Sequence, residues 1–234
     1  MNVVVRAPAK LTLSLRITGI RDDGYHLIDA EMVTISLADE LLFAPGNGLV
    51  VIDEVGSGLP VHADPENLVS RALDAVRRQA HVTLYKRVPA GAGLGGGSAD
   101  AAAVLRWAGC TDRAVARRLG ADVTFCLLGG HGRVRGIGDQ VETMPPIQDS
   151  YTLLVPPLSC STPAVYRAWD DLGGPTSEHN DLERAALVVA PDLAKYRDQL
   201  GDATGIQPRL AGSGSTWFVP GSFPGEGLVV VQAE

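Results

Sequence analysis

The chain has 234 residues, of which 45% are hydrophobic and 20% are charged, a composition typical of a globular protein with one large domain or two small ones. Its formal net charge is −7 at pH 7, which disfavours a general nucleic-acid binder, because such proteins are usually basic. The three cysteines, Cys110, Cys126 and Cys160, form no CxxC pair, which argues against a disulfide framework and a structural zinc site. No signal or transit segment is recognised, and no apolar run approaches the roughly 18 residues that cross a bilayer, so we expect a cytoplasmic protein.

The chain up to Val88 is predicted to form strands and one helix. Residues 11–18 alternate apolar and polar side chains, which is typical of a half-buried strand, and Lys10 lies directly before it. Pro65 suits the first turn of a helix, and apolar residues then follow at helical spacing. Further strands are predicted at 33–37, 49–52 and 81–88, and the helix at 65–80.

A glycine-rich segment, residues 89–100, follows the last of these strands and has five glycines in the seven positions from 91 to 97. Glycines let backbone N–H groups approach an anion without Cβ clashes, and a helix expected at 101–107 directs its positive N-terminal end to the same place. The segment therefore predicts a polyphosphate cradle. Ser98 is expected to cap the helix and to reach a phosphate or Mg²⁺, while Lys86 and Arg87 either neutralise the phosphates or are solvated.

Other interpretations of this segment fit less well. A Walker A loop is excluded, because it ends in Gly-Lys-Ser/Thr and no lysine occurs here. A dinucleotide-binding fingerprint is matched by Gly91, Gly93 and Gly96. That fold also expects an acidic residue at the end of a second parallel strand. Asp122 comes before an apolar run and not after one, so it does not fit this position. A plain tight turn stays open as a structural interpretation.

The rest of the chain mixes both kinds of element. A helix is predicted at 111–119 with Thr111 as its N-cap, and strands are predicted between 131 and 156. A break in the pattern at Pro156-Pro157 marks the expected domain boundary. Further elements are predicted as helices at about 163–171 and 180–200, a turn at 212–214 and a strand at 228–231. Strands and helices without a regular βαβ cycle favour an α+β fold.

Residues 89–98, Pro-x-Gly-x-Gly-Leu-Gly-Gly-Gly-Ser, resemble the ATP-binding signature of the GHMP kinases. The longer form, Gly-Ala-Gly-Leu-Gly-Gly-Gly-Ser-x-Asp-Ala-Ala, is similar to that of one branch, the 4-diphosphocytidyl-2-C-methyl-D-erythritol kinases. Seven further segments resemble motifs of this branch in the same order, namely 7–10, 23–26, 66–69, 119–123, 161–166, 180–183 and 211–215.

The resemblance implies the two-domain α+β fold of GHMP kinases. Residues 1–155 would form the ATP-binding domain, and residues 156–234 a ferredoxin-like C-terminal domain that lacks one helix. It also implies ATP-dependent phosphorylation of the 2-hydroxyl of 4-diphosphocytidyl-2-C-methyl-D-erythritol, on the methylerythritol phosphate route to isoprenoids, with Mg²⁺ as a cofactor. The partner would be this small cytidine diphosphate compound, without nucleic acid or membrane, and the protein a monomer or weak homodimer.

The resemblance further implies the residues of the site. Asp122 would act on the proton of the acceptor hydroxyl, and Lys10 would keep Asp122 ionised and stabilise charge on the γ-phosphate; a surface Lys–Asp pair is the structural alternative. Tyr25 and Tyr166 would enclose the cytosine. The ATP-binding residues would be Asn67, Pro89, Ala90, Gly91, Ala92, Gly93, Leu94, Gly95, Gly96, Gly97, Ser98 and Ala99. The substrate-binding residues would be Thr12, Tyr25, His26, Thr162, Tyr166, Gly212 and Ser213. No side chain is assigned as a metal ligand.

Some positions depart from the pattern of that branch. Thr12 stands where asparagine is common, and the segments after Asp100 and after Phe218 are short. Two alternatives therefore stay open: a GHMP kinase for another small alcohol, and a nucleotide-binding protein with reduced or no kinase activity.

Overall fold

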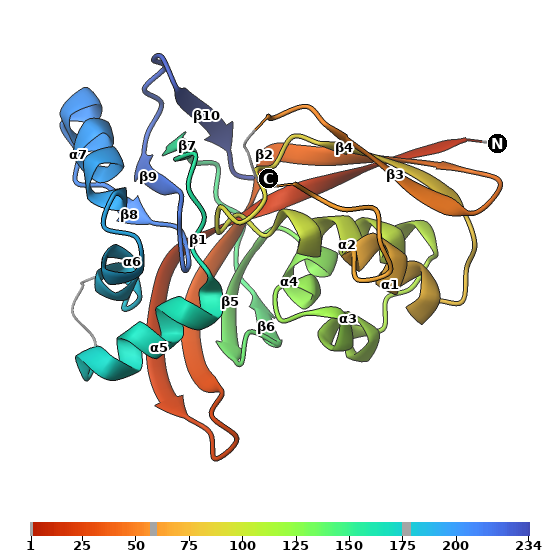
Figure 1. Cartoon of the computed structure of the whole chain (residues 1–234), viewed down its shortest axis with the longest axis horizontal. Coiled ribbons are helices and arrows are strands. Elements are labelled where there is room, and N and C mark those ends of the chain that lie inside the picture. Colours follow the sequence, from red (N-terminus) through yellow and green to blue (C-terminus); the bar gives the residue numbers. More distant parts are fainter. Residues whose placement is uncertain (1, 57–59, 175–178) are drawn as a thin grey trace.

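The computed structural model describes residues 2–56, 60–174 and 179–234. It contains a six-stranded and a four-stranded β-sheet, and Figure 1 shows helices α1–α4 along one face of the larger sheet and α5–α7 beside the smaller one. No helix in the described ranges is long and apolar enough to cross a membrane.

The larger sheet is built around a long hairpin. β1 and β2 pair antiparallel, and the turn between them is closed by a hydrogen bond from the Arg21 amide to the Tyr25 carbonyl. The order is β3-β4-β2-β5-β6 with β1 also paired to β2. β3 and β4 are parallel, so the chain crosses over through α1 between them. The strands are β1 (Val3–Ile20), β2 (His26–Ala44), β3 (Gly48–Asp53), β4 (His81–Lys86), β5 (His131–Gly136) and β6 (Gln140–Thr143).

Helix α2 is the centre of the first core. Its residues Ala101, Ala102 and Ala103 are fully buried, because small side chains let the helix lie close to the sheet and its neighbours. It packs against α1, α4, β1 and β2. The helices on this face are α1 (Leu68–Ala75), α2 (Gly96–Trp107), α3 (Arg113–Leu119) and α4 (Val123–Leu128).

The smaller sheet has the order β10-β7-β9-β8. Trp217 on β9 is fully buried, and its indole N–H donates to the Leu193 carbonyl at the start of α7 at 3.1 Å. The elements are β7 (Ser150–Leu154), α5 (Thr162–Leu172), α6 (Glu183–Val189), α7 (Leu193–Thr204), β8 (Arg209–Leu210), β9 (Trp217–Pro220) and β10 (Leu228–Gln232).

Asp181, just before α6, ties this part of the chain to the long hairpin. Its carboxylate is buried and accepts the Ile17 amide and the Arg16 guanidinium of β1, both at 2.8 Å. Its own amide donates to the Leu15 carbonyl at 2.9 Å. Near the other end of the fold, the Glu234 amide donates to the Thr34 carbonyl of β2 at 2.9 Å.

The expected α+β fold is confirmed, but several bounds differ. The helix expected at 65–80 covers only Leu68–Ala75, because Asn67 caps it through the Val69 amide and Arg77 has a positive φ of 52°. The helix expected at 180–200 is two helices, α6 and α7, separated at Ala190 and Pro191. Asp112, not Thr111, caps α3, and α4 was not predicted.

The domain division expected between residues 155 and 156 stays a prediction, as does the missing helix. β7 lies before that point and already pairs with β9 and β10. The chain therefore enters the smaller sheet at Ser150.

Candidate active site

A cavity of about 1030 Å³ brings together residues from both parts of the chain. Almost all of the residues predicted for the site line it. These are Lys10, Thr12, Tyr25, His26, Asn67, Pro89, Ala90, Gly91, Ala92, Gly93, Gly95, Gly96, Gly97, Ser98, Asp122, Thr162, Tyr166, Gly212 and Ser213. Leu94 and Ala99 do not line it; their side chains are buried in the two hydrophobic cores.

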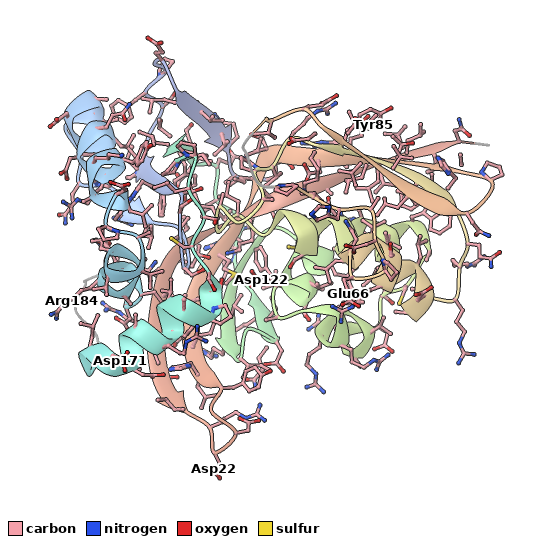
Figure 2. All side chains as sticks on the ribbon, in the orientation of Figure 1. Asp22, Glu66, Tyr85, Asp122, Asp171 and Arg184 are labelled. Atoms are coloured by element: carbon pink, nitrogen blue, oxygen red, sulfur yellow. The ribbon has the colours of Figure 1, made fainter. Side chains whose placement is uncertain are left out.

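Lys10 lines the cavity and lies at an irregularity of β1 between Pro8 and Lys10. Its side chain is almost fully buried, and the ammonium donates to the Gly93 carbonyl at 2.8 Å and to the Thr12 hydroxyl at 3.0 Å. Its Nζ lies 3.6 Å from Asp122 Oδ2. Asp122 is the N-cap residue of α4, and Figure 2 labels it between α5 and the helices of the larger sheet.

The Lys10–Asp122 pair is not an ordinary surface ion pair. The lysine side chain is 6% exposed and the aspartate 31%, so the ammonium is held in place by the protein while one side of the carboxylate faces the cavity. The Thr12 hydroxyl accepts one of the hydrogen bonds that hold the Lys10 ammonium. Thr12 is therefore part of the site, although its side chain is shorter than the asparagine that is common at this position.

The glycine-rich segment wraps over this lysine and leads into α2. Gly91, Gly93 and Gly95 have positive φ angles of 72°, 79° and 70°, which favour glycine. A Cβ on Gly93 would lie 2.3 Å from the Ala211 carbonyl oxygen, and one on Gly95 would lie 2.9 Å from Lys10 Cγ. At these two positions a side chain would therefore clash with other atoms of the protein, whether or not an anion binds to the segment.

The start of α2 has the features of an anion cradle. Gly95 is its N-cap residue and provides no side-chain cap, so N–H groups of the first turn have no helical acceptor and carry the positive end of the helix dipole. The expectation that Ser98 caps this helix is wrong, because the helix begins earlier, at Gly96, and Ser98 lies inside its first turn. Ser98 does line the cavity.

A buried cluster of charged side chains lies beneath the glycine-rich segment. The sequence analysis did not predict that these side chains come together. Lys86 contacts Asp39 of β2 and lies 2.9 Å from Asp100 of α2. Asp39 also accepts the backbone amides of Arg87 and Val88 at 2.6 and 2.8 Å. Lys86 is thus already neutralised by protein carboxylates and is not solvated, whereas Arg87 pairs with Glu54 on the surface.

Asp100 is the unusual member of this cluster. It is 3% exposed, and its Oδ1 has no hydrogen-bond partner among the described residues. Burial raises its pKa to about 8, against the opposing effect of the Lys86 charge. In the sequence, only the place of Asp100 in the glycine-rich motif indicated that this residue is special. The pattern of polar and apolar residues alone predicts an ordinary polar position on a helix.

The far end of the cavity is aromatic. The His26 ring lies 4.7 Å from the Tyr166 ring and 5.5 Å from the Trp169 ring, centroid to centroid. Burial, with a further effect of the Asp122 charge, raises the pKa of Tyr166 to about 12, so its hydroxyl is neutral at pH 7. Tyr25 is 61% exposed at the hairpin turn. Asp170, which hydrogen-bonds His26 at 2.7 Å, was also missed by the sequence analysis.

Gly212 and Ser213 line the cavity beside the glycine-rich segment, and a Cβ on Gly212 would lie 3.7 Å from the Gly93 carbonyl oxygen. Asn180 holds them in place, because its side-chain amide donates to the Leu210 and Gly212 carbonyls at 2.8 and 2.7 Å. The Ser213 and Thr162 hydroxyls are 2.8 Å apart. The four predicted segments around residues 10, 95, 162 and 212 therefore meet at one cavity.

Comparisons with known proteins agree with this geometry. The family model for the GHMP kinases N terminal domain matches residues 67–130. A 4-diphosphocytidyl-2-C-methyl-D-erythritol kinase from Paracoccus denitrificans is 38% identical over 233 residues, which cover 91% of this chain and 84% of that protein. One from Ruegeria pomeroyi is 38% identical over 256 residues, covering 97% of this chain and 91% of that protein.

Solved structures extend the likeness to the fold. A crystal structure of 4-(cytidine 5′-diphospho)-2C-methyl-D-erythritol kinase superposes with a TM-score of 0.76 at 29% identity and covers 100% of both chains. A homoserine kinase from Cytophaga hutchinsonii, at 19% identity, has a TM-score of 0.60 over 99% of this chain and 94% of that one, and is similar in fold alone.

Proposed function

Since the chain belongs to the 4-diphosphocytidyl-2-C-methyl-D-erythritol kinase family of the GHMP kinases, we propose that its cavity transfers the γ-phosphate of ATP to the 2-hydroxyl of that cytidylated alcohol. The observation that carries this proposal is the meeting of Lys10, Asp122 and the glycine-rich segment at one cavity. Phosphoryl transfer needs mainly positioning and charge stabilisation, and these three features supply both.

Lys10 and Asp122 are the groups proposed to act at the reacting atoms. The Asp122 carboxylate orients the acceptor hydroxyl and takes up its proton as the hydroxyl oxygen bonds to the γ-phosphorus and the bond from that phosphorus to the ADP leaving group breaks. The Lys10 ammonium, 3.6 Å away, stabilises negative charge on the acceptor oxygen and on the transferring phosphoryl group. The hydrogen bonds from Lys10 to Gly93 and Thr12 hold the ammonium in this position before ATP binds.

The glycine-rich segment is proposed to bind the phosphates of ATP. The residues at the start of α2, Gly96, Gly97 and Ser98, line the cavity, as do Asn67 and Pro89. The β- and γ-phosphates are proposed to bind beside Lys10, which lines the same cavity as the glycine-rich segment.

Mg²⁺ is proposed as the metal that accompanies ATP. At ATP-binding sites Mg²⁺ is usually held by phosphate oxygens, water and one or two protein ligands. Ser98 and Asp122 line the cavity and are the side chains proposed to reach it. When bound, Mg²⁺ neutralises charge on the phosphates.

The aromatic end of the cavity is proposed to bind the cytosine. The Tyr166 ring lies beside His26, and Tyr25 projects from the neighbouring hairpin turn. Stacking of a base on an aromatic ring contributes about 1–3 kcal/mol. The exposed position of Tyr25 suits a ring that covers the base after it has bound.

A coupled ATPase assay with a panel of alcohols tests the proposed function. The panel contains 4-diphosphocytidyl-2-C-methyl-D-erythritol, homoserine and mevalonate, with kcat/KM measured for each. We expect turnover of the cytidylated compound alone. Turnover of another alcohol would replace the substrate assignment, and ATP binding without turnover of any alcohol would support a nucleotide-binding protein without kinase activity.

A further inference from the structure

The imidazole of His26 is held by the carboxylate of Asp170, which lines the same cavity. His26 Nε2 lies 2.7 Å from Asp170 Oδ1, a distance typical of a strong hydrogen bond. His26 begins β2, whereas Asp170 lies in the last turn of α5. Two elements that are 144 positions apart in the sequence thus meet at this bond.

This bond determines which ring nitrogen carries the proton. An ionised carboxylate accepts hydrogen bonds and cannot donate one, so Nε2 must be the N–H donor. In the neutral imidazole Nδ1 is then unprotonated and is an acceptor. No group in the described part of the chain hydrogen-bonds Nδ1, and His26 lines the cavity.

The surroundings keep the ring in one orientation. Tyr166 lies against one side of the imidazole at 4.7 Å with an interplanar angle of 40°, and Trp169 meets it edge-on at 5.5 Å and 87°. The His26 side chain is 10% exposed. Because two aromatic rings and the carboxylate restrict it, the imidazole cannot turn over to present the other nitrogen without losing these contacts.

We propose that Asp170 is a positioning residue for base selection: it fixes His26 as the Nε2–H tautomer, so that Nδ1 accepts a hydrogen bond from the exocyclic amino group of the substrate's base. Cytosine carries an amino donor at this position, whereas uracil carries a carbonyl acceptor. A fixed acceptor therefore binds the cytidylated compound and rejects its uridylated counterpart, since two facing acceptors remain unpaired. This inference rests on the proposed function and explains why the enzyme would select a substrate with cytosine over one with uracil.

Nitrogen NMR of histidine-labelled protein tests the tautomer directly. The His26 signals are assigned by their loss in the His26→Gln variant, which separates them from the other four histidines. We expect a pyrrole-type Nε2 and a pyridine-type Nδ1 in the wild-type protein at pH 8, and a mixture of tautomers in Asp170→Ala. A pyrrole-type Nδ1 in the wild-type protein would overturn the proposal.

Binding of CDP and UDP tests the consequence for specificity. Calorimetry is done with the ATP site filled by a non-hydrolysable ATP analogue, so that only the substrate end of the cavity is measured. We expect Asp170→Ala to reduce the preference for CDP over UDP by about tenfold, the effect of one hydrogen bond between neutral groups. Asp170→Glu keeps a carboxylate acceptor and is expected to retain part of the preference.

Asp171→Ala is the matched control. Asp171 is the next residue on α5 and is exposed, and it is labelled in Figure 2; its replacement changes the net charge by the same amount. An equal CDP-to-UDP ratio in the two alanine variants would overturn the inference. If the wild-type protein bound no CDP and did not phosphorylate the cytidylated alcohol, the proposed function itself would fail, and the NMR result would still report the tautomer separately.

Discussion

At the scale of single residues, the site depends on a lysine that is immobilised before any ligand arrives. Lys10 is almost fully buried, donates two hydrogen bonds and is covered by Gly95. A lysine on a surface loses rotamer freedom when it binds a phosphate, whereas this one has lost it on folding. The sequence motif identified Lys10 and Asp122, but the Thr12 and Gly93 contacts that hold the lysine needed the fold.

Asp122→Asn tests the residue proposed to act on the hydroxyl. The amide keeps the shape of the side chain but cannot take up a proton, so we expect kcat to fall by about 10²- to 10⁴-fold with an unchanged melting temperature. Asp74→Asn, an exposed aspartate on α1, is the control and should keep full activity. Near-normal turnover in a folded Asp122→Asn protein would remove this residue from the chemistry.

Gly95→Ala tests the contact between the glycine-rich segment and Lys10. The new Cβ would lie 2.9 Å from Lys10 Cγ, so the ammonium must shift and kcat/KM should fall by at least tenfold. Gly109→Ala has the same backbone strain, with a φ of 71° against 70°, but its Cβ meets nothing within 4 Å. Both variants should lose about 1–2 kcal/mol of stability from the left-handed conformation, and only Gly95→Ala should lose activity. Equal activities would mean that the Lys10 contact has no role in catalysis.

At the scale of elements, the buried cluster of Lys86, Asp39 and Asp100 joins the two ends of the glycine-rich segment. Asp39 binds the amides just before the segment, and Asp100 is the last residue of the segment and lies on α2. The sequence predicted the strand, the segment and the helix here because each has a clear local pattern. It did not predict the cluster, because Asp39 comes from β2, 47 positions before Lys86, and no local pattern connects them.

This cluster predicts a dependence of stability on pH. The pKa of Asp100 is raised by burial from 3.8 to about 8, so between these values the folded protein binds a proton that the unfolded chain releases. The resulting stabilisation is complete below about pH 4 and is lost as the pH rises through about 8. The pKa of Lys86 is also raised, because the charges of Asp100 and Asp39 outweigh its burial, so it stays cationic over this range.

Urea unfolding of the wild-type protein and of Asp100→Asn between pH 6 and 9 measures this effect. We expect the free energy of unfolding of the wild-type protein to fall with pH by at most about 1.4 kcal/mol per pH unit from this group, and the slope to be smaller in Asp100→Asn. Histidines and other groups contribute equally to both proteins and cancel in the comparison. Identical slopes would show that Asp100 is ionised throughout this range.

At the scale of the whole molecule, the cavity lies where the two sheets meet along the β1–β2 hairpin, and both hydrophobic clusters contain residues of both sheets. Lys10, Thr12 and His26 come from that hairpin, while Tyr166 and Gly212 come from the other part of the chain. Sequence patterns predicted the α+β class and most elements. The joint itself could not be predicted from periodicity, because it depends on contacts between residues far apart in the sequence, such as those of the Asp181 carboxylate with the Ile17 amide and of the Glu234 amide with the Thr34 carbonyl.

Asp181→Ala tests whether this joint supports the whole cavity. The substitution leaves the Ile17 amide without its acceptor and removes the Arg16 ion pair, both at 2.8 Å, so we expect a loss of about 1–3 kcal/mol in the free energy of unfolding. Since the joint positions both walls, binding of the ATP analogue and of CDP should weaken together, unlike in Asp170→Ala, where only CDP should be affected. Asp198→Ala is the control, because Asp198 is 60% exposed and its ion pair is with its sequence neighbour Arg197, a contact that contributes little. If Asp181→Ala unfolded at the same urea concentration as Asp198→Ala and bound both ligands normally, the Asp181 carboxylate would not be needed to hold the two parts of the chain together.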